Sequence, residues 1–405
     1  MSMGRLTAGS AAVLGWVAAR AIRFEYTRIV SETNDLRGPL EAWLRMKLPD
    51  ARDLRVGALR KPAAGESSDT QLFTIELAAA AAAGGGQRGP AGELLGDEDA
   101  GCVAAVLRCA PRGEGAFPEY DLGLQAHVMR SLAAKGSVPV PEVLWLEEDP
   151  QVLGVPFLVM RAVDGEAPLD RPSYQGEGFY CEASPALRAH IWAATVEATA
   201  RLHALDWREL GGGVVSGARP GDDPELASLA YWRRYFDEWV KEDPSEPVAV
   251  FDEAIAYLER ERPKSPRLAL CWGDAKLGNV LYAPGSRDVA AVIDWEMAII
   301  GDPEADLASL HVSDLRAQDA AGGVCLPGTP TADELVGLYE KASGRRVENF
   351  DYNMVFATFW RGSVMLAVIR QMRRRGVPID DALFVDNFPI RELRRLLDLP
   401  ALQQE

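Results

Sequence analysis

Residues 271–282 read Cys-Trp-Gly-Asp-Ala-Lys-Leu-Gly-Asn-Val-Leu-Tyr, and residues 292–296 read Val-Ile-Asp-Trp-Glu. The two stretches contain three oxygen-bearing side chains, those of Asp274, Asn279 and Asp294. Each of the three borders a short apolar run, which predicts that a buried strand fixes its position. Metal and phosphate sites need ligands that are held still in this way. The pattern therefore predicts a site for a metal ion or a phosphate group.

The spacing of these three side chains is typical of phosphoryl transfer. An Asp, an Asn five residues later and a strand-borne Asp form the catalytic loop and metal-binding residue of kinases. In that chemistry Asp274 accepts the proton of an attacking hydroxyl, while Asn279 and Asp294 hold magnesium through oxygen atoms. Each residue also has a purely structural interpretation, as a turn Asp, a capping Asn and a strand-end Asp. Only the combination favours a kinase-like site.

Size and composition limit the class of protein. The chain of 405 residues is long enough for two lobes, and 48% of it is hydrophobic and 25% charged, as in an ordinary globular protein. The net charge of −17 argues against a nucleic-acid partner, because nucleic-acid phosphates are bound by basic surfaces. The five cysteines show no C-x-x-C spacing, and their odd number does not suggest a disulfide framework. A reducing compartment fits best, so we expect a cytoplasmic protein.

The hydrophobic runs do not suggest a membrane partner. The apolar run of residues 11–19 is too short to cross a bilayer. We favour an N-terminal helix that packs on the body of the protein, and a weak targeting segment is the alternative. No other segment is long and apolar enough to suggest a transmembrane helix.

The N-terminal half alternates between helical and strand-like patterns. These patterns predict helices at residues 29–46 and 120–134 and strands at residues 54–59, 71–77, 102–109, 142–146 and 156–163. Residues 78–99 contain an alanine run and a glycine run, which predict a flexible hairpin loop. The order of elements predicts a small antiparallel lobe of five strands with one helix.

After residue 165 the pattern becomes mainly helical. We expect helices at residues 185–205, 226–240, 248–261, 331–342, 351–374 and 381–399. A further helix opens after Asp302, a candidate N-cap, and Asp306 is expected to support the catalytic loop by hydrogen bonding. The fold class is α+β. The predicted divisions are a helical extension (1–50), a small nucleotide-binding lobe (51–164) and a larger helical lobe with the catalytic loop and substrate-binding helices (165–405).

The small lobe offers candidate groups for a nucleotide phosphate. Arg108 lies in the third predicted strand, where its cation can hold α- and β-phosphates. Ser67, Ser68 and Thr70 lie between the first two strands, and such a hairpin can present hydroxyls and backbone N–H groups to phosphate. The structural alternatives are a surface charge and a polar hairpin.

Several motifs in order carry a family resemblance. Members of the aminoglycoside phosphotransferase family read H-G-D-x-x-x-x-N, then I-D-W-E, then G-D-P-x-x-D-L-A. The same run stands here as Trp272-Gly273-Asp274, Asn279, Ile293-Asp294-Trp295-Glu296, Gly301-Asp302-Pro303 and Asp306-Leu307-Ala308. The chain therefore resembles this family. It is most similar to actinobacterial members whose substrates the sequence does not reveal, and to the kinase-like domains attached to some acyl-CoA dehydrogenases.

The resemblance implies a fold, a reaction and a set of residue roles. The fold would be the two-lobed protein-kinase-like fold, and the reaction an ATP- and magnesium-dependent transfer of the γ-phosphate to a small-molecule hydroxyl. Asp274 would be the base, Asn279 and Asp294 the magnesium ligands, and Arg108 the nucleotide-phosphate cation. The implied adenine contacts are the hinge segment Met160, Arg161, Ala162 and Val163, with Leu281 under the ring.

The chain departs from the family pattern at three positions. Trp272 stands in place of a His that supports the loop, and an indole N–H needs a partner. Arg108 stands in place of a Lys, and Gln125 in place of the Glu that pairs with it. These departures motivate the alternative that the chain is a non-catalytic nucleotide-binding module. A protein kinase is disfavoured, because no H-R-D, D-F-G or A-P-E motif is present.

Overall fold

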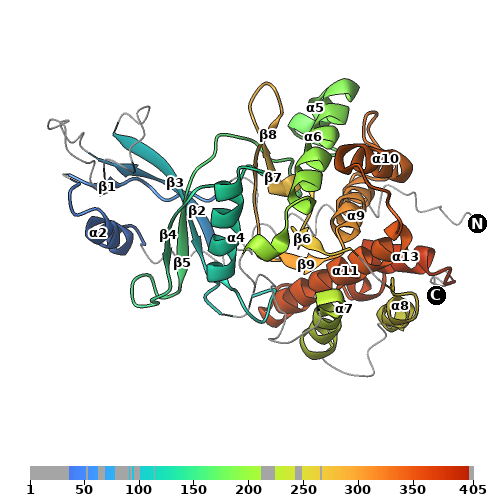
Figure 1. Ribbon diagram of the computed structural model, residues 1–405. Helices are drawn as coiled ribbons and strands as arrows, with labels where there is room; N and C mark the ends of the chain where they lie inside the picture. The colour runs from blue at the N-terminus through green and yellow to red at the C-terminus, as the bar shows by residue number, and fades with distance from the viewer. Residues whose placement is uncertain are drawn as a thin grey trace, which may run out of the picture.

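A computed structural model describes residues 36–51, 53–62, 69–77, 91, 94, 101–113, 115–210, 224–241, 249–264 and 267–400. Within this part of the chain the molecule has two lobes, a sheet-containing N-lobe and a mainly helical C-lobe (Figure 1). The predicted N-terminal helix before residue 36, the serines Ser67 and Ser68, and most of the predicted loop 78–99 lie outside the described residues.

The N-lobe contains one antiparallel sheet, as predicted. Its strands are β1 (Arg55–Val56), β2 (Asp69–Glu76), β3 (Cys102–Cys109), β4 (Val143–Glu147) and β5 (Phe157–Arg161). Their order in the sheet is β1-β2-β3-β5-β4, and every neighbouring pair is antiparallel. The α+β prediction is confirmed, and β3 occupies the centre of the sheet.

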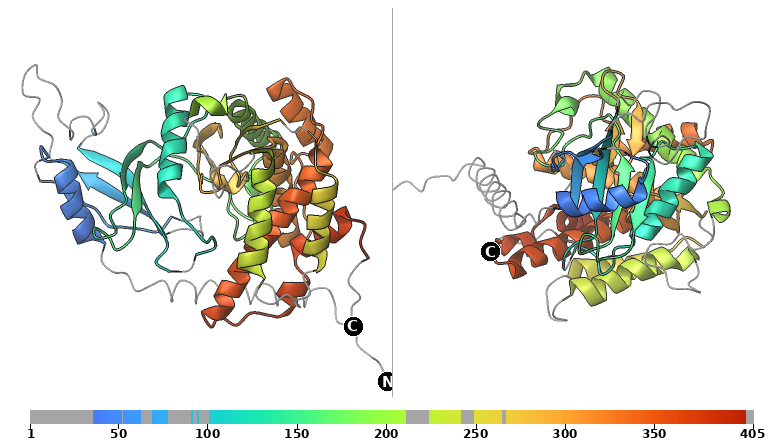
Figure 2. Two further views of the ribbon diagram at one scale, coloured as in Figure 1. Left: turned by 60° about the horizontal axis from the view of Figure 1, so that its bottom comes forward. Right: turned by 90° about the vertical axis from the view of Figure 1, so that its left-hand side faces the viewer.

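Two helices pack on opposite sides of this sheet. α2 (Arg37–Lys47) lies across the side that faces away from the C-lobe, as Figures 1 and 2 show. Its buried Trp43 packs edge-on against Phe157 of β5, with ring centroids 4.8 Å apart. α4 (Leu122–Lys135) lies on the side of the C-lobe and shares a hydrophobic core with it. α2 therefore belongs to the core of the sheet, and the division of the chain at 50/51 and 164/165 stays a prediction.

The C-lobe is built mainly from helices (Figure 2). These are α5 (Phe179–Glu182), α6 (Pro185–His203), α7 (Pro224–Arg234) continued by a π-helical turn (Tyr235–Val240), α8 (Ala249–Arg260), α9 (Glu304–Ala320), α10 (Ala332–Ser343), α11 (Phe350–Arg374), α12 (Ala382–Val385) and α13 (Phe388–Leu396). Short 3-10 helices span Trp207–Leu210 and Leu277–Asn279. One prediction is wrong here, because residues 381–399 form two helices. Asn387 caps the second one by accepting from the Ile390 N–H, and Pro389 suits a first helical turn but not a helix interior.

Helix α11 runs through the middle of the C-lobe. Among the described residues it is the one helix that is long and apolar enough to cross a membrane, contrary to the expectation that no segment would be. Its most apolar window is 72% buried against the rest of the lobe. A core helix has this length and composition too, and packing in the core accounts for both.

Two small antiparallel sheets hold the motif residues. β6 (Ala269–Cys271) pairs with β9 (Ile299–Gly301), and β7 (Val280–Tyr282) pairs with β8 (Val289–Val292). Asp274 follows β6, Asn279 directly precedes β7, and Asp294 lies between β8 and β9. The short strands therefore bring three residues that are separated in sequence to one edge of the C-lobe.

Candidate active site

The backbone of the catalytic loop is fixed by one buried carboxylate. Asp306, near the start of α9, accepts hydrogen bonds from the N–H groups of Trp272 at 2.6 Å and Gly273 at 2.9 Å. His203 Nε2 lies 3.0 Å from the same carboxylate. Gly273 has a φ of +88°, and a Cβ there would collide with the carbonyl of Met297, so the position requires glycine. Asp306 thus supports the loop, as the sequence indicated.

Trp272 finds the hydrogen-bond partner that its indole requires. The ring is 1% exposed, and its Nε1–H donates to the carbonyl of Ile293 at 2.9 Å. Ile293 directly precedes Asp294, so the indole connects the catalytic loop to the segment that carries the candidate metal ligand. The substitution of Trp for His at this position therefore keeps the loop anchored.

The carboxylate of Asp274 has three polar neighbours. Asn279 Nδ2 donates to its Oδ2 at 2.8 Å, the Arg361 guanidinium lies 3.0 Å from its Oδ1, and the Lys276 ammonium lies 3.5 Å from its Oδ2. Burial by itself would raise the pKa of Asp274, but Lys276 and Arg361 outweigh this effect and hold that pKa below its ordinary value. Asp274 is therefore an ionised, firmly oriented carboxylate.

The two cations beside Asp274 were not predicted from the sequence. Lys276 also pairs with Asp170 at 3.0 Å, and Arg361 donates to the carbonyl of Ala275 at 2.9 Å and to Ser309 Oγ at 2.6 Å. Lys276 lies inside the catalytic motif, where its position could have drawn attention to it. Arg361 lies in the middle of α11, far along the chain, and no local pattern distinguishes it from a helix-surface arginine.

A second charged cluster joins the two lobes. Arg108, on β3 of the N-lobe, pairs with Asp294 at 2.9 Å and with Glu296 at 2.5 Å. The comparison with the family placed Gln125 opposite Arg108, but the guanidinium pairs with these two carboxylates instead. A buried guanidinium requires an ionised partner, and a neutral amide could not balance its charge.

The second cluster is crowded with acid. Burial, followed by the charge of Asp294, raises the pKa of Glu296 to about 8, although Arg108 opposes the shift. Asp294 has a φ of +64°, an unfavourable conformation for a residue with a side chain, and such strain is concentrated at functional sites. Among the described residues, two carboxylates therefore meet one guanidinium here.

The donor set suits a magnesium ion. Asn279 directs its amide nitrogen toward Asp274, which leaves the amide oxygen as its ligand atom. Asp294 uses one carboxylate oxygen for Arg108, and Glu296 is close enough for its pKa to respond to Asp294. An amide oxygen and a carboxylate are ligands that Mg²⁺ accepts, and a divalent cation would offset the excess of acid.

The predicted nucleotide contacts that the structure describes lie on β2, at and after the end of β5, and on β7. Thr70 is the register partner of Arg108 on the neighbouring strand β2. Met160 and Arg161 end β5, and the N–H of Arg161 is used within the sheet. The Val163 N–H has no backbone partner among the described residues. Leu281 on β7 lies against the chain at Gly165, beyond the hinge.

Comparison with known proteins places these residues in a family context. A family model described as "Phosphotransferase enzyme family" (APH) matches residues 59–335. Acyl-CoA dehydrogenase family member 10 of Mus musculus is 28% identical over 281 residues, which cover 66% of this chain and 24% of the relative. The chain thus spans about a quarter of the length of this curated relative.

Solved structures share the fold. The crystal structure of a candidate aminoglycoside phosphotransferase from Ralstonia eutropha superposes with a TM-score of 0.61 at 21% identity, covering 89% of this chain and 95% of that one. A thermostable mutant of an aminoglycoside phosphotransferase, solved with AMP-PNP and hygromycin B, has a TM-score of 0.50 at 17% identity and covers 89% and 97%. The protein-kinase-like fold predicted from the motifs is confirmed.

Proposed function

We propose that this chain, which belongs to the aminoglycoside phosphotransferase family of phosphotransferase enzymes, transfers the γ-phosphate of ATP to a hydroxyl group of a small molecule. The observation that carries the proposal is the environment of Asp274. Its carboxylate is ionised, is held by Asn279 and Arg361, and lies in the loop that the two small sheets present toward the N-lobe.

In the proposed reaction the hydroxyl of the acceptor donates a hydrogen bond to the carboxylate of Asp274. The hydroxyl oxygen attacks the γ-phosphorus, the bond from that phosphorus to the β–γ bridging oxygen breaks, and ADP leaves with the electron pair. The proton of the hydroxyl passes to Asp274. Because Lys276 and Arg361 make Asp274 a weak base, its main contribution is to orient the hydroxyl, and the proton moves late.

The nucleotide side of the site uses residues from both lobes. Arg108 and Thr70 face the phosphates, and the proposal extends the phosphate contacts to Ser67 and Ser68. The hinge residues Met160, Arg161 and Val163 border the adenine, with Leu281 beneath it. Magnesium, held by Asn279 and Asp294, would supply positive charge to the phosphate oxygens.

The test uses Asp274→Asn, which keeps the size of the side chain and removes its charge. With purified protein, ATP, magnesium and a panel of small hydroxyl compounds, we expect ADP release from the wild type and a loss of about 10²–10⁴-fold in the variant. ATP should stabilise both proteins equally in a thermal-shift assay, which controls for folding and nucleotide binding. Equal turnover by wild type and variant would refute the role of Asp274.

One observation favours a second function, a non-catalytic nucleotide-binding module. Arg108 already pairs with one of the two carboxylate oxygens of Asp294, the candidate metal ligand. In a binding module this pair would persist, and ATP would bind without turnover. Thermal stabilisation by ATP that does not depend on magnesium, with no ADP release under any condition, would favour this alternative over phosphotransfer.

A further inference from the structure

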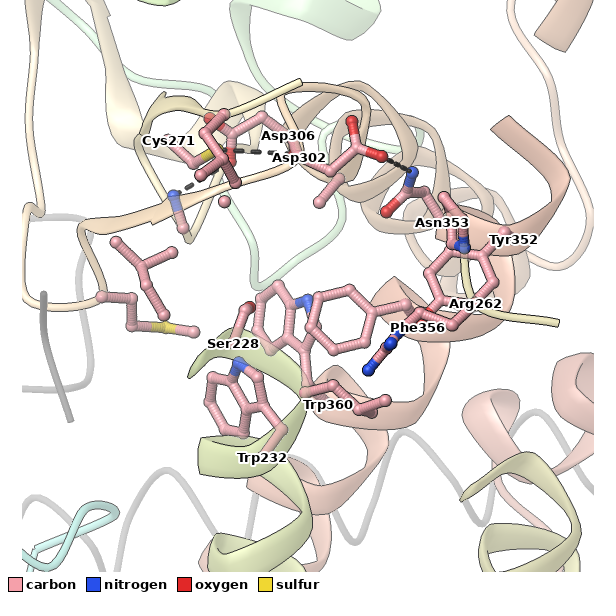
Figure 3. Close-up of a pocket in the computed structure, with 18 residues that line it drawn as sticks. Ser228, Trp232, Arg262, Cys271, Asp302, Asp306, Tyr352, Asn353, Phe356 and Trp360 are labelled. Atoms are coloured by element: carbon pink, nitrogen blue, oxygen red, sulfur yellow. Dashed lines mark hydrogen bonds between the residues drawn. The ribbon is translucent and has the colours of Figure 1, made fainter. Parts of the chain in front are cut away.

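An aromatic cavity of about 60 Å³ opens beside the catalytic loop, between α7, β9, α9 and α11. Its apolar walls include Trp232, Met297, Ile299, Tyr352, Phe356 and Trp360. Figure 3 shows the rings of Trp232, Trp360 and Phe356 on the side of the cavity opposite Asp302 and Asp306. The indoles of Trp232 and Trp360 stack with their centroids 5.2 Å apart. A nearly flat aromatic wall of this kind suits an apolar ligand.

The cavity reaches the residue that precedes the candidate base. Gly273, the residue before Asp274, forms part of its wall. Trp360 lines it as well, and the guanidinium of the next residue, Arg361, lies over the Trp360 ring at 4.5 Å and contacts Asp274 at 3.0 Å. A molecule seated in the cavity therefore has the catalytic loop as its neighbour.

A smaller cavity of about 20 Å³ extends the aromatic wall toward the second acidic cluster. It shares Trp232, Met297 and Ile299 with the first cavity and adds Phe117, Glu119, Tyr231 and Glu296. The two cavities thus share part of one wall. Their common wall continues from the catalytic loop toward the phosphate-facing part of the site.

The carboxylates in the wall of the larger cavity are already engaged. Asp302 accepts from Asn353 at 3.1 Å, from Asn349 at 3.2 Å and from the N–H of Glu304 at 3.0 Å. Asp306 holds the catalytic loop through both of its oxygens. The remaining charged side chain in this wall is a cation, Arg262. The carboxylate oxygens of the wall thus already accept hydrogen bonds, and burying the several amino groups of a polycationic sugar among aromatic side chains and beside Arg262 would be costly.

We propose that the acceptor has an apolar alkyl or aromatic body without cationic groups, which fills this cavity while its hydroxyl lies at Asp274. This inference rests on the proposed phosphotransfer and narrows its substrate class. Each methylene group that moves from water into the cavity should strengthen binding by up to about fourfold. Binding should therefore rise along a series of straight-chain alcohols until the cavity is full, and an aminoglycoside should bind poorly.

Two matched leucine substitutions on α9 test the site. Ala305 lines the cavity, and Ala305→Leu fills part of it, whereas Ala320 is exposed at the end of the same helix, and Ala320→Leu serves as the control. Binding of 1-butanol, 1-hexanol, 1-octanol, 2-phenylethanol and kanamycin is followed by quenching of tryptophan fluorescence without nucleotide. We expect chain-length-dependent binding in the wild type and in Ala320→Leu, and at least a tenfold loss in Ala305→Leu.

A variant that enlarges the cavity keeps the test valid if Ala305→Leu fails to fold. Met297→Ala removes side-chain volume from the wall shared by the two cavities, so the alcohol length that binds best should increase. Equal alcohol affinities in all four proteins, or tighter binding of kanamycin than of every alcohol, would overturn the inference.

ADP release with ATP and magnesium separates this inference from the proposed function. Alcohols that bind in the cavity without any turnover would support the cavity and count against phosphotransfer. Turnover of some other hydroxyl compound, with no alcohol binding in the cavity, would overturn the inference and leave phosphotransfer standing. Turnover of an alcohol with a higher KM in Ala305→Leu than in Ala320→Leu would support both.

Discussion

Two clusters of buried acid face each other across the candidate site, and their charges are balanced in opposite ways. Asp274 has two cations in contact, Lys276 and Arg361, and its pKa is held low. Asp294 and Glu296 both pair with the same guanidinium, that of Arg108, and the pKa of Glu296 is raised to about 8. Acidic residues therefore form an ionised carboxylate with two cationic neighbours on one side, and a pair of carboxylates around one guanidinium on the other.

The difference indicates on which side of the site the charges of the carboxylates are balanced without a bound ligand. The cluster at Asp274 has its charge balanced by side chains that are also held by Asp170 and Ser309. In the described part of the chain, the cluster at Asp294 brings two carboxylates to one guanidinium, and a magnesium ion would supply further positive charge there. Substitutions that remove one charge from each side should therefore have opposite effects on the protein without ligands.

The largest effect is expected for Arg361→Met on the balanced side. The substitution breaks the direct contact between Arg361 and the buried Asp274 carboxylate, and breaking a buried ion pair costs about 3–5 kcal/mol of unfolding free energy. The position of the Asp274 carboxylate should loosen as well, so kcat should fall more than KM rises. Urea unfolding and steady-state kinetics of ADP release measure the two effects.

A conservative variant distinguishes positioning from general stability. Arg361→Lys keeps the positive charge next to Asp274 and should recover a large part of the stability but less of kcat, because an ammonium cannot contact Asp274, Ala275 and Ser309 together. If kcat recovers in full with Lys, the fork geometry of Arg361 has no role in the reaction.

On the acid-rich side, Asp294→Asn should affect ligand binding rather than the stability of the free protein. Loss of this charge lets Arg108 pair with Glu296 alone, so the unfolding free energy without ligands should stay the same or rise. A ligand at 100 times its Kd stabilises a protein by about 2.7 kcal/mol, and the magnesium-dependent share of this gain with ATP should disappear. Thermal shifts with ATP, with and without magnesium, measure it. A variant that keeps the full magnesium-dependent shift would exclude Asp294 as a ligand.

The sequence allowed one side of this comparison to be predicted better than the other. Asp274, Asn279 and Asp294 follow from spacing, since short strands place residues of one motif together. Arg108 follows from its place on a central strand. The role of Arg361 could not be predicted from the sequence, because a cation in the middle of a long helix has the same local pattern whether it faces solvent or a carboxylate. Its partner is decided by how α11 packs against the catalytic loop.

The aromatic cavity escaped prediction for a similar reason. Its wall combines Trp232 of α7, Met297 after the Asp294 segment, and Trp360 of α11. Each of these residues fits the apolar stripe of its own element and reads as ordinary core. The space between them exists only in the tertiary arrangement, and the hydrophobic periodicity of a single helix does not predict a cavity.

A smaller effect is expected at the connection between the two sides. Trp272→Phe keeps an aromatic but smaller side chain and removes the hydrogen bond to the carbonyl of Ile293. Loss of a partly buried hydrogen bond costs about 0.5–1.5 kcal/mol, and the Asp294 segment should become more mobile. Unfolding free energy and hydrogen exchange in residues 293–297 measure this change. Unchanged exchange there would show that Asp306 alone anchors the loop.

The smallest effect is expected for Glu296→Gln, which leaves Arg108 with Asp294 as its one charged partner. The substitution removes a carboxylate whose burial already disfavours its ionised form, so the lost attraction to Arg108 and the relieved repulsion from Asp294 nearly cancel. We expect a change in unfolding free energy of less than about 1 kcal/mol, well below that of Arg361→Met. A loss as large as that of Arg361→Met would mean that Glu296 is a full partner of Arg108, and that the acid-rich side is as completely balanced as the side of Asp274.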